Sequence, residues 1–236
     1  MNERNSGINT CMDNSSIDKS CERGDKRAVI LTSYIDHPEL IREIPSGTVI
    51  CADGGYVAAE RFGLKPEILI GDYDSARKPD HPDVLLPCVK DMTDSEAAVD
   101  LAVSKGYNDI LVLGGLGGRL DHTMGNIGVM AKYCGKGVRV AFADGQNYAF
   151  MLSPGDYHIS PNHLGIKFKY MGLIAYGGEV PRLTVKGTKY ELDSAALGVD
   201  TTLGVSNEII EDTAFVSFDS GMLLVALSSD VLRARF

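Results

Sequence analysis

Short apolar runs alternate with segments of helical periodicity between residues 28 and 142, and this alternation constrains the fold more than any other feature of the chain. Strand-like runs lie at 28–32, 48–52, 67–70, 84–89, 110–113 and 138–142. Helices are expected at 56–62, from Thr93 to Lys105 after a capping box of Thr93 and Glu96, and at about 121–133. Strands that alternate with helices predict a parallel sheet with right-handed crossovers.

The pattern changes after about residue 150. Helical periodicity disappears, and strand-like runs follow at 165–170, 173–176, 183–185, 214–218 and 222–227, separated by turn residues. This texture predicts a small antiparallel sandwich or barrel. We therefore expect an α/β domain over residues 26–150 and an all-β domain over residues 151–236. Residues 1–25 are polar and lack periodicity, so we expect them to form a flexible leader.

Composition narrows the classes of partner. The formal net charge of −9 argues against a nucleic-acid partner, which favours a basic face, but it does not exclude a nucleotide ligand. The sequence shows no apolar run of membrane-spanning length and no secretory signal, so no membrane partner is expected. The five cysteines are scattered and contain no C-x-x-C pair, which is typical of reduced thiols in a cytoplasmic protein.

Aspartates gather where the predicted strands end. Asp53 follows the second strand, Asp72 and Asp74 follow the third, and Asp94 opens a helix. Ligands of open α/β sheets bind at the carboxyl ends of strands. Without lysine partners these carboxylates would repel one another, and the simplest cation to hold them is Mg²⁺. Asp72 and Asp74 point to the same side of an extended segment and could share it.

Three of these four aspartates also have a plain structural interpretation. Asp favours turns, which would explain Asp72 and Asp74. It is also favoured at the positive end of a helix dipole, which would explain Asp94. Asp53 could hold a ligand hydroxyl or a metal-bound water, with Gly54 and Gly55 allowing close backbone approach.

A glycine-rich turn precedes the last predicted helix. Its glycines are Gly114, Gly115, Gly117 and Gly118. Backbone amides at a helix start favour anions, and Arg119 offers a fork that suits phosphate oxygens. The turn is neither a Walker A loop nor a dinucleotide-binding fingerprint. The alternative is a flexible turn with a surface arginine. His122 could be a phosphate donor, a proton relay or a capping-turn histidine, and a supporting role is expected.

The motifs, taken in order, resemble the thiamine pyrophosphokinase family. The matching segments are Ala52–Gly55, Gly71–Ser75, Lys90–Asp94, Gly117–His122, Leu183–Tyr190 and Leu203–Asn207. The resemblance covers roughly residues 28–236. It implies a nucleotide-binding α/β domain followed by a β-sandwich, and a homodimer that holds thiamine between its subunits. It also implies transfer of pyrophosphate from ATP to the thiamine hydroxyl, giving thiamine diphosphate and AMP.

The same resemblance assigns roles to individual residues. The Mg²⁺ and phosphate-site acids would be Asp72, Asp74 and Asp94. The catalytic pocket would be completed by Asp53, Arg119 and Asp121. Nucleotide contacts would come from Gly54, Gly55, Gly115, Gly117, Gly118, Arg119 and His122. The thiamine pocket would contain Ser206 and Asn207.

Two departures from the family pattern bear on the site. Thr32-Ser33-Tyr34 follows the first strand where many members have a glycine-rich turn. The chain has no Trp, whereas some members stack one on the thiamine ring. Two other functions explain part of the pattern: a pyrophosphokinase for another small alcohol, such as a hydroxymethylpterin, and a non-catalytic thiamine or nucleotide sensor.

Overall fold

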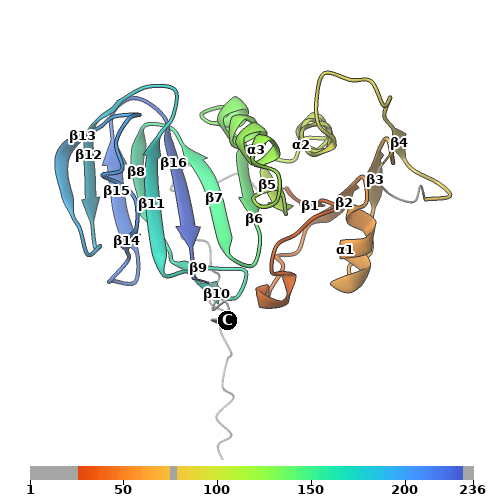
Figure 1. Ribbon diagram of the computed structural model, residues 1–236, viewed down its shortest axis with the longest axis horizontal. Helices are drawn as coiled ribbons and strands as arrows, with labels where there is room; N and C mark the ends of the chain where they lie inside the picture. The colour runs from red at the N-terminus through yellow and green to blue at the C-terminus, as the bar shows by residue number, and fades with distance from the viewer. Residues whose placement is uncertain (1–25, 75–78, 231–236) are drawn as a thin grey trace, which may run out of the picture.

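The computed structural model describes residues 26–74 and 79–230 of the chain, so the expected leader lies outside the described residues. A parallel sheet forms the first half (Figure 1). Its strands are β1 (Arg27–Leu31), β2 (Thr48–Ala52), β3 (Ile68–Gly71), β4 (Val84–Leu85), β5 (Asp109–Leu113) and β6 (Arg139–Ala143). The helices between them are α1 (Gly55–Arg61), α2 (Asp94–Ser104) and α3 (Leu120–Tyr133), with a short 3₁₀ turn, η1 (Pro38–Leu40).

The helices cover opposite faces of this sheet, with α2 and α3 on one side and α1 on the other (Figure 1). Strand β1 is apolar at every position from Ala28 to Leu31, and its packing shows why. Ala28 and Ile30 pack in the cluster that contains α2 and α3, whereas Val29 and Leu31 pack in the cluster that contains Ala59 of α1. A parallel strand buried on both faces needs apolar residues at every position.

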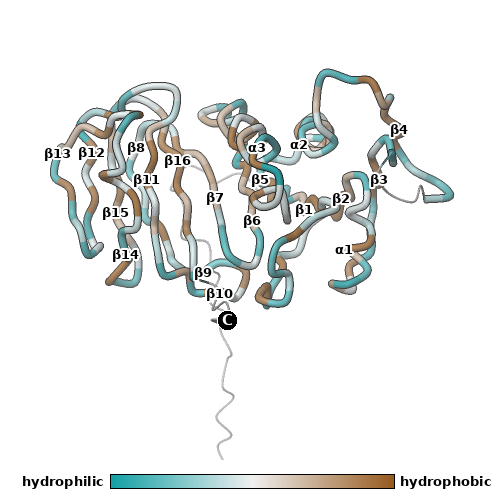
Figure 2. The backbone as a smooth tube through the Cα atoms, in the orientation of Figure 1, coloured by the Kyte–Doolittle hydropathy of each residue, from teal (hydrophilic) through white to brown (hydrophobic). Residues whose placement is uncertain are grey.

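The second half is all β. Its strands are β7 (Asn147–Leu152), β8 (Gly155–Ile159), β9 (Asn162–His163), β10 (Ile166–Lys167), β11 (Tyr170–Ala175), β12 (Val180–Lys186), β13 (Leu192–Leu197), β14 (Asn207–Glu208), β15 (Ala214–Phe218) and β16 (Leu223–Ser228). The antiparallel sheet β13-β12-β15-β8 shares a hydrophobic core with β7, β16 and β11. Hydrophobic residues lie along many of these strands (Figure 2). The predicted β-sandwich is confirmed.

One sheet runs through both halves of the molecule. Its order is β14-β11-β16-β7-β6-β5-β1-β2-β3-β4, and β7 pairs with β6 on one side and β16 on the other. The expected domain boundary near residue 150 therefore falls inside β7, and the chain enters the sandwich without leaving the sheet. None of the helices in the described part of the chain is long and apolar enough to cross a membrane.

Candidate active site

Asp53 and Asp72 meet where β2 and β3 end. These strands are parallel neighbours, so the turns that follow them lie side by side. The Asp53 amide donates a hydrogen bond to the carbonyl oxygen of Ile70 at 2.8 Å. Gly71 permits this contact, because a Cβ on that residue would lie 2.8 Å from the Asp53 Cα. The sheet therefore holds both acids at the carboxyl ends of its strands, as the sequence predicted.

Lys90 joins two of the acids. Its ammonium donates to Asp72 Oδ2 and lies 3.4 Å from Asp94 Oδ1. The side chains of Lys90, Asp72 and Asp94 are 13%, 4% and 25% exposed, so most of this contact is shielded from water. The expectation that the acids have no lysine partner is wrong. Lys90 supplies the positive charge that the expectation gave to a metal ion.

The two carboxylates differ in their ionisation. The hydrogen bond from Lys90 lowers the pKa of Asp72, which holds that carboxylate ionised. Burial raises the pKa of Asp94, and the opposing attraction of Lys90 does not cancel this effect. Asp94 Oδ1 is buried and, among the described residues, has the ion-pair contact with Lys90 but no hydrogen bond. This oxygen keeps its capacity to accept a further ligand.

The arrangement fits a hard cation in part. A positive charge already lies within reach of both Asp72 and Asp94, and carboxylate oxygens are the ligands that Mg²⁺ takes. Asp74 is exposed, and its backbone N–H donates to Asp72 Oδ1 at 3.2 Å. Within residues 26–74 and 79–230, no three His, Cys, Asp or Glu side chains are arranged as a ready metal site. The Mg²⁺ site therefore stays a prediction.

Ser33 holds the turn that carries Asp53. Its Oγ donates to Asp53 Oδ2 at 3.1 Å and accepts from the Gly54 N–H at 3.0 Å. Asp53 has a positive φ of 49°, a left-handed conformation that is uncommon outside Gly. Ser33 thus connects the end of β1 to the acid site, and sequence reasoning missed this role.

Arg119, Asp121 and His122 form a separate group at the start of α3. Arg119 donates to both carboxylate oxygens of Asp121, at 3.1 and 2.5 Å, and this bond lowers the pKa of Asp121. The His122 backbone N–H also donates to Asp121, at 3.0 Å. All three side chains belong to exposed residues. Within the described residues, no ion pair joins this group to Asp72 or Asp94.

The local structure explains some of the predicted nucleotide-binding glycines by packing and leaves others at the surface. A Cβ on Gly55 would lie 2.0 Å from the Leu31 carbonyl oxygen, so this glycine lets α1 approach β1. A Cβ on Gly115 would lie 2.5 Å from Asn126 Nδ2, and Gly115 accepts a hydrogen bond from that amide. Gly117 is half-buried and Gly118 exposed, and both lie beside Tyr34 of the loop that follows β1. Packing accounts for the first two glycines without a ligand.

The two predicted thiamine residues differ in accessibility. Asn207 is buried, and its side chain bonds to Thr188, to the backbone of Tyr190 and to the Glu208 N–H. Its observed contacts therefore hold the segment around residue 188. Ser206 is exposed. Both residues lie at the β14 end of the ten-stranded sheet, whereas Asp72 lies near the β3–β4 end.

A hollow on the opposite edge of the sheet is not part of this arrangement. It is lined at the amino ends of β1, β2 and β5 by residues that include Arg27, Thr48 and Asp109. Arg27 and Arg139 both form ion pairs with Asp109, so these charged side chains neutralise one another at the amino ends of the strands. The acids that the sequence singled out lie at the carboxyl ends instead.

Comparison with known proteins gives a consistent family. The family model described as "Thiamin pyrophosphokinase, catalytic domain" matches residues 44–142, and "Thiamin pyrophosphokinase, vitamin B1 binding domain" matches residues 156–223. The chain is 30% identical to the thiamine pyrophosphokinase of Bacillus subtilis over 208 residues, which cover 85% of this chain and 92% of the relative. A relative from Oryza sativa, thiamine pyrophosphokinase 1, is 28% identical, covering 74% of this chain and 76% of its own length.

Solved structures agree with the sequence relatives. The crystal structure of the Bacillus subtilis enzyme superposes with a TM-score of 0.77 at 27% identity, covering 88% of this chain and all of that one. The structure from Geobacillus thermodenitrificans gives a TM-score of 0.75 at 28% identity, covering 87% and 99% of the two chains. Two family models in sequence order, a 30% identical relative matched along most of its length and the shared fold lead to one conclusion: the chain belongs to the thiamin pyrophosphokinase family.

Proposed function

We propose that this enzyme transfers the pyrophosphoryl group of ATP to the hydroxyl of thiamine in a Mg²⁺-dependent reaction, giving thiamine diphosphate and AMP. Its family membership makes it a transferase. The observation that carries the proposal is the junction of Asp53, Asp72 and Asp94 at the carboxyl ends of β2 and β3, with a cation position between two of them. Open α/β sheets bind their ligands at this edge.

The acid residues would have different roles because their pKa values are shifted in different directions. Asp72 stays ionised and Asp94 Oδ1 has no hydrogen bond, so these two are the residues that would hold Mg²⁺ once Lys90 moves aside, with Asp74 as a further ligand. A bound Mg²⁺ neutralises phosphate oxygens and so favours attack on phosphorus. Lys90, displaced from one carboxylate, would bring its ammonium to the same phosphates. Asp53 is held in place by Ser33 to complete the pocket.

The nucleotide's phosphates have a second partner in the turn between β5 and α3. Half-buried Gly117 and exposed Gly118 lie just before the start of α3, where the helix dipole favours an anion. Arg119 is exposed and paired with Asp121, so its guanidinium can exchange that carboxylate for a phosphate oxygen. We place the triphosphate between this turn and the acid site.

We further propose that the active enzyme is a homodimer. Ser206 and Asp72 lie near opposite ends of one sheet, and eight strand spacings of about 4.8 Å separate β14 from β3 by roughly 35–40 Å. One chain cannot bring both groups to the same thiamine molecule. The sandwich half also exposes apolar side chains that a second copy would cover, namely Ile174, Tyr190, Leu203, Val205 and Ile210. An isologous pair of chains would complete two pockets.

The test follows the nucleotide products. Purified protein is incubated with Mg²⁺, ATP and thiamine, and the nucleotides are separated by ion exchange. AMP that forms in step with thiamine diphosphate supports the proposal, and a hydroxymethylpterin in place of thiamine should give no turnover. ADP with thiamine monophosphate, or turnover with the pterin alone, would exclude it. Absence of turnover despite thiamine binding would favour the sensor.

We also propose a cytoplasmic location. Cys51, Cys88 and Cys134 are free thiols, as expected in a reducing compartment.

A further inference from the structure

Beyond Ser33, the loop that follows β1 has no role in the site described above, yet it lies at the topological switch point of the sheet. From β1 the chain proceeds through β2, β3 and β4 on one side, and it returns to place β5 on the other side. Ligands of open α/β sheets bind in the crevice where the strand order reverses in this way. The residues that follow β1 and β5, namely 32–37 and 114–118, border this point.

This loop is fixed at both ends. The Thr32 hydroxyl lies 3.1 Å from the carbonyl oxygens of both Tyr34 and Leu113, so it ties the loop to the end of β5. Farther along, the Gly145 N–H donates to the Asp36 carbonyl oxygen at 2.9 Å. Tyr34 lies between these anchors and is 53% exposed. An exposed aromatic ring on an anchored loop loses little further freedom when a ligand binds.

The ring of Tyr34 lies against the glycine-rich turn. A Cβ on Gly117 would lie 3.4 Å from Tyr34 Cε1, and one on Gly118 would lie 3.6 Å away. The edge of the Tyr34 ring thus lies beside the backbone of Gly117 and Gly118. The same turn is our proposed grip for the nucleotide's phosphates, so the ring stands beside the phosphate path.

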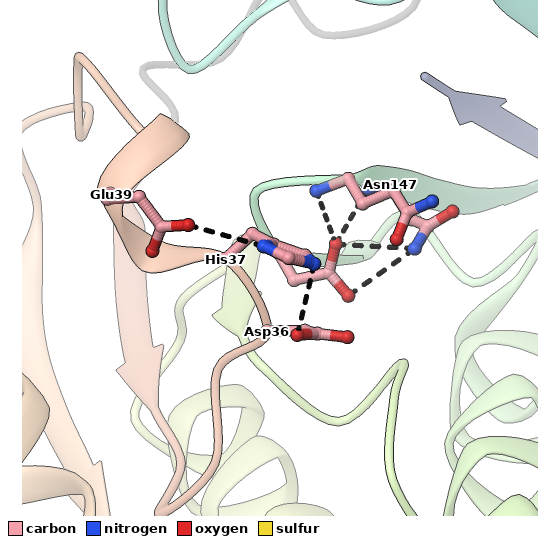
Figure 3. Close-up of polar contacts among 6 residues, drawn as sticks. Asp36, His37, Glu39 and Asn147 are labelled. Carbon is pink, nitrogen blue, oxygen red and sulfur yellow. Dashed lines mark hydrogen bonds and ion pairs between the residues drawn. The ribbon is translucent and has the colours of Figure 1, made fainter. Parts of the chain in front are cut away.

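A carboxylate accompanies the ring. Asp36 Oδ2 would lie 3.2 Å from a Cβ on Gly117, so it faces the same turn. Figure 3 shows His37 between Asp36 and Glu39; its Nε2 is 3.6 Å from Asp36 Oδ1, and its Nδ1 is 3.2 Å from Glu39 Oε1. The Asp36 side chain remains partly exposed. An ionised carboxylate only accepts hydrogen bonds, so it suits a ligand that presents an amino group.

We propose that Tyr34 is the stacking platform for the base of the nucleotide and that Asp36 accepts a hydrogen bond from the exocyclic amino group of adenine. Guanine presents a carbonyl oxygen at that position, and two acceptors repel each other. The pair would therefore favour ATP over GTP. This proposal rests on the proposed function, because it takes the nucleotide's phosphates to lie at the glycine-rich turn.

Binding measurements test the platform without turnover. Calorimetry compares AMP, which has a base, with inorganic pyrophosphate, which has none, for the wild type and for Tyr34→Ala, Tyr34→Leu and Tyr34→Phe. Loss of base stacking should weaken AMP binding on the order of tenfold in the Ala and Leu variants, with pyrophosphate binding unchanged. The Phe variant keeps the ring and should bind AMP as the wild type does. Equal AMP affinity in all four proteins would overturn the proposal.

Kinetics test the choice of ring and base. Tyr34→Ala should raise KM for ATP and leave KM for thiamine unchanged; the reverse result would assign the ring to thiamine and overturn the proposal. Asp36→Asn can donate to guanine, so the ratio of kcat/KM for ATP and GTP should narrow on the order of tenfold. An unchanged ratio would exclude Asp36. If the wild type forms no thiamine diphosphate, the proposed function fails, whereas the AMP measurement still decides the role of Tyr34.

Discussion

Replacing Lys90 with Met tests the electrostatic account of the acid site. The change keeps a side chain of similar length and removes the charge between Asp72 and Asp94. Asp72 is only 4% exposed, so it would remain as a nearly buried carboxylate without its ion pair. Breaking a fully buried pair costs about 3–5 kcal/mol. Because Asp94 is 25% exposed, we expect a loss of about 2–3 kcal/mol.

Thermal and urea unfolding measure this loss. For a chain of this size it corresponds to a fall in Tm of roughly 5–10 °C. Lys132→Met is the matched control, because Lys132 also bridges two carboxylates, those of Glu96 at 2.9 Å and Asp100 at 2.8 Å in α2. The Lys132 side chain is 38% exposed, so its ion pairs are less shielded. The control variant should cost less than about 1 kcal/mol. Equal losses in the two variants would refute the shielded role of Lys90.

The pH dependence gives the same prediction a second readout. Lys90 lowers the folded-state pKa of Asp72, so Asp72 contributes stability above its unfolded pKa of about 3.9, and this contribution is lost as pH falls through the folded value. Asp94 has the opposite sign, because its raised pKa favours the protonated form and costs stability as pH rises. The difference between wild type and Lys90→Met should therefore shrink below about pH 4. A difference that does not depend on pH would contradict the ion pair.

Three further predictions concern the site, the packing and the leader. Asp72→Asn and Asp74→Asn should each lower kcat on the order of a hundredfold, but only the first should also lower Tm, because exposed Asp74 has no ion pair in the described structure. Gly55→Ala should prevent stable folding, since its Cβ would lie 2.0 Å from a β1 carbonyl oxygen, whereas Gly125→Ala has open space in α3 and should raise stability by about 0.5–1 kcal/mol in urea unfolding. Deletion of residues 1–25 should leave Tm and thiamine diphosphate formation nearly unchanged; a large loss of either would show that this segment has a role.

The strands of the parallel sheet could be predicted because burial on both faces leaves a simple signature. The run 48–52 matches β2, and 110–113 matches most of β5. The second helix begins as its capping residue indicated, with Thr93 Oγ1 accepting from the Glu96 N–H at 3.2 Å. The fourth strand is shorter than expected, ending at Leu85, and Pro87 lies in the segment that was expected to continue it.

The continuity of the sheet could not be predicted in this way. Strand β7 forms an antiparallel connection between the two halves, and pairing partners are set by contacts between distant segments. Strand β13 was missed because its sequence, LDSAAL, has neither the alternation nor the β-branched residues of a strand. The sequence therefore indicated two kinds of architecture but not the one sheet that they share.

The site shows the same division. The meeting of Asp53 and Asp72 follows from strand order, because the carboxyl ends of parallel neighbours share an edge. Lys90 belongs to a motif in which the sequence indicates the aspartates as the functional residues. The spacing of the sequence does not show that the Lys90 side chain reaches Asp72 at the end of β3. Asn207 is buried and hydrogen-bonds to Thr188, Tyr190 and Glu208, contacts between distant segments that sequence spacing does not show, and its place in the thiamine pocket stays a prediction.

Mixing two inactive variants tests the central claim most directly, namely that each active site takes its acids from one chain and its sandwich residues from another. Asp72→Asn disables the acids, and Ser206→Arg places bulk and positive charge where cationic thiamine should bind. Random pairing makes half of the dimers mixed, each with one intact site, so the mixture should form thiamine diphosphate at about one quarter of the wild-type rate. The double variant, paired with wild type, should give mixed dimers with no intact site. Mixed dimers that native mass spectrometry detects but that remain inactive in the first mixture, or that are half active in the second, would contradict the account.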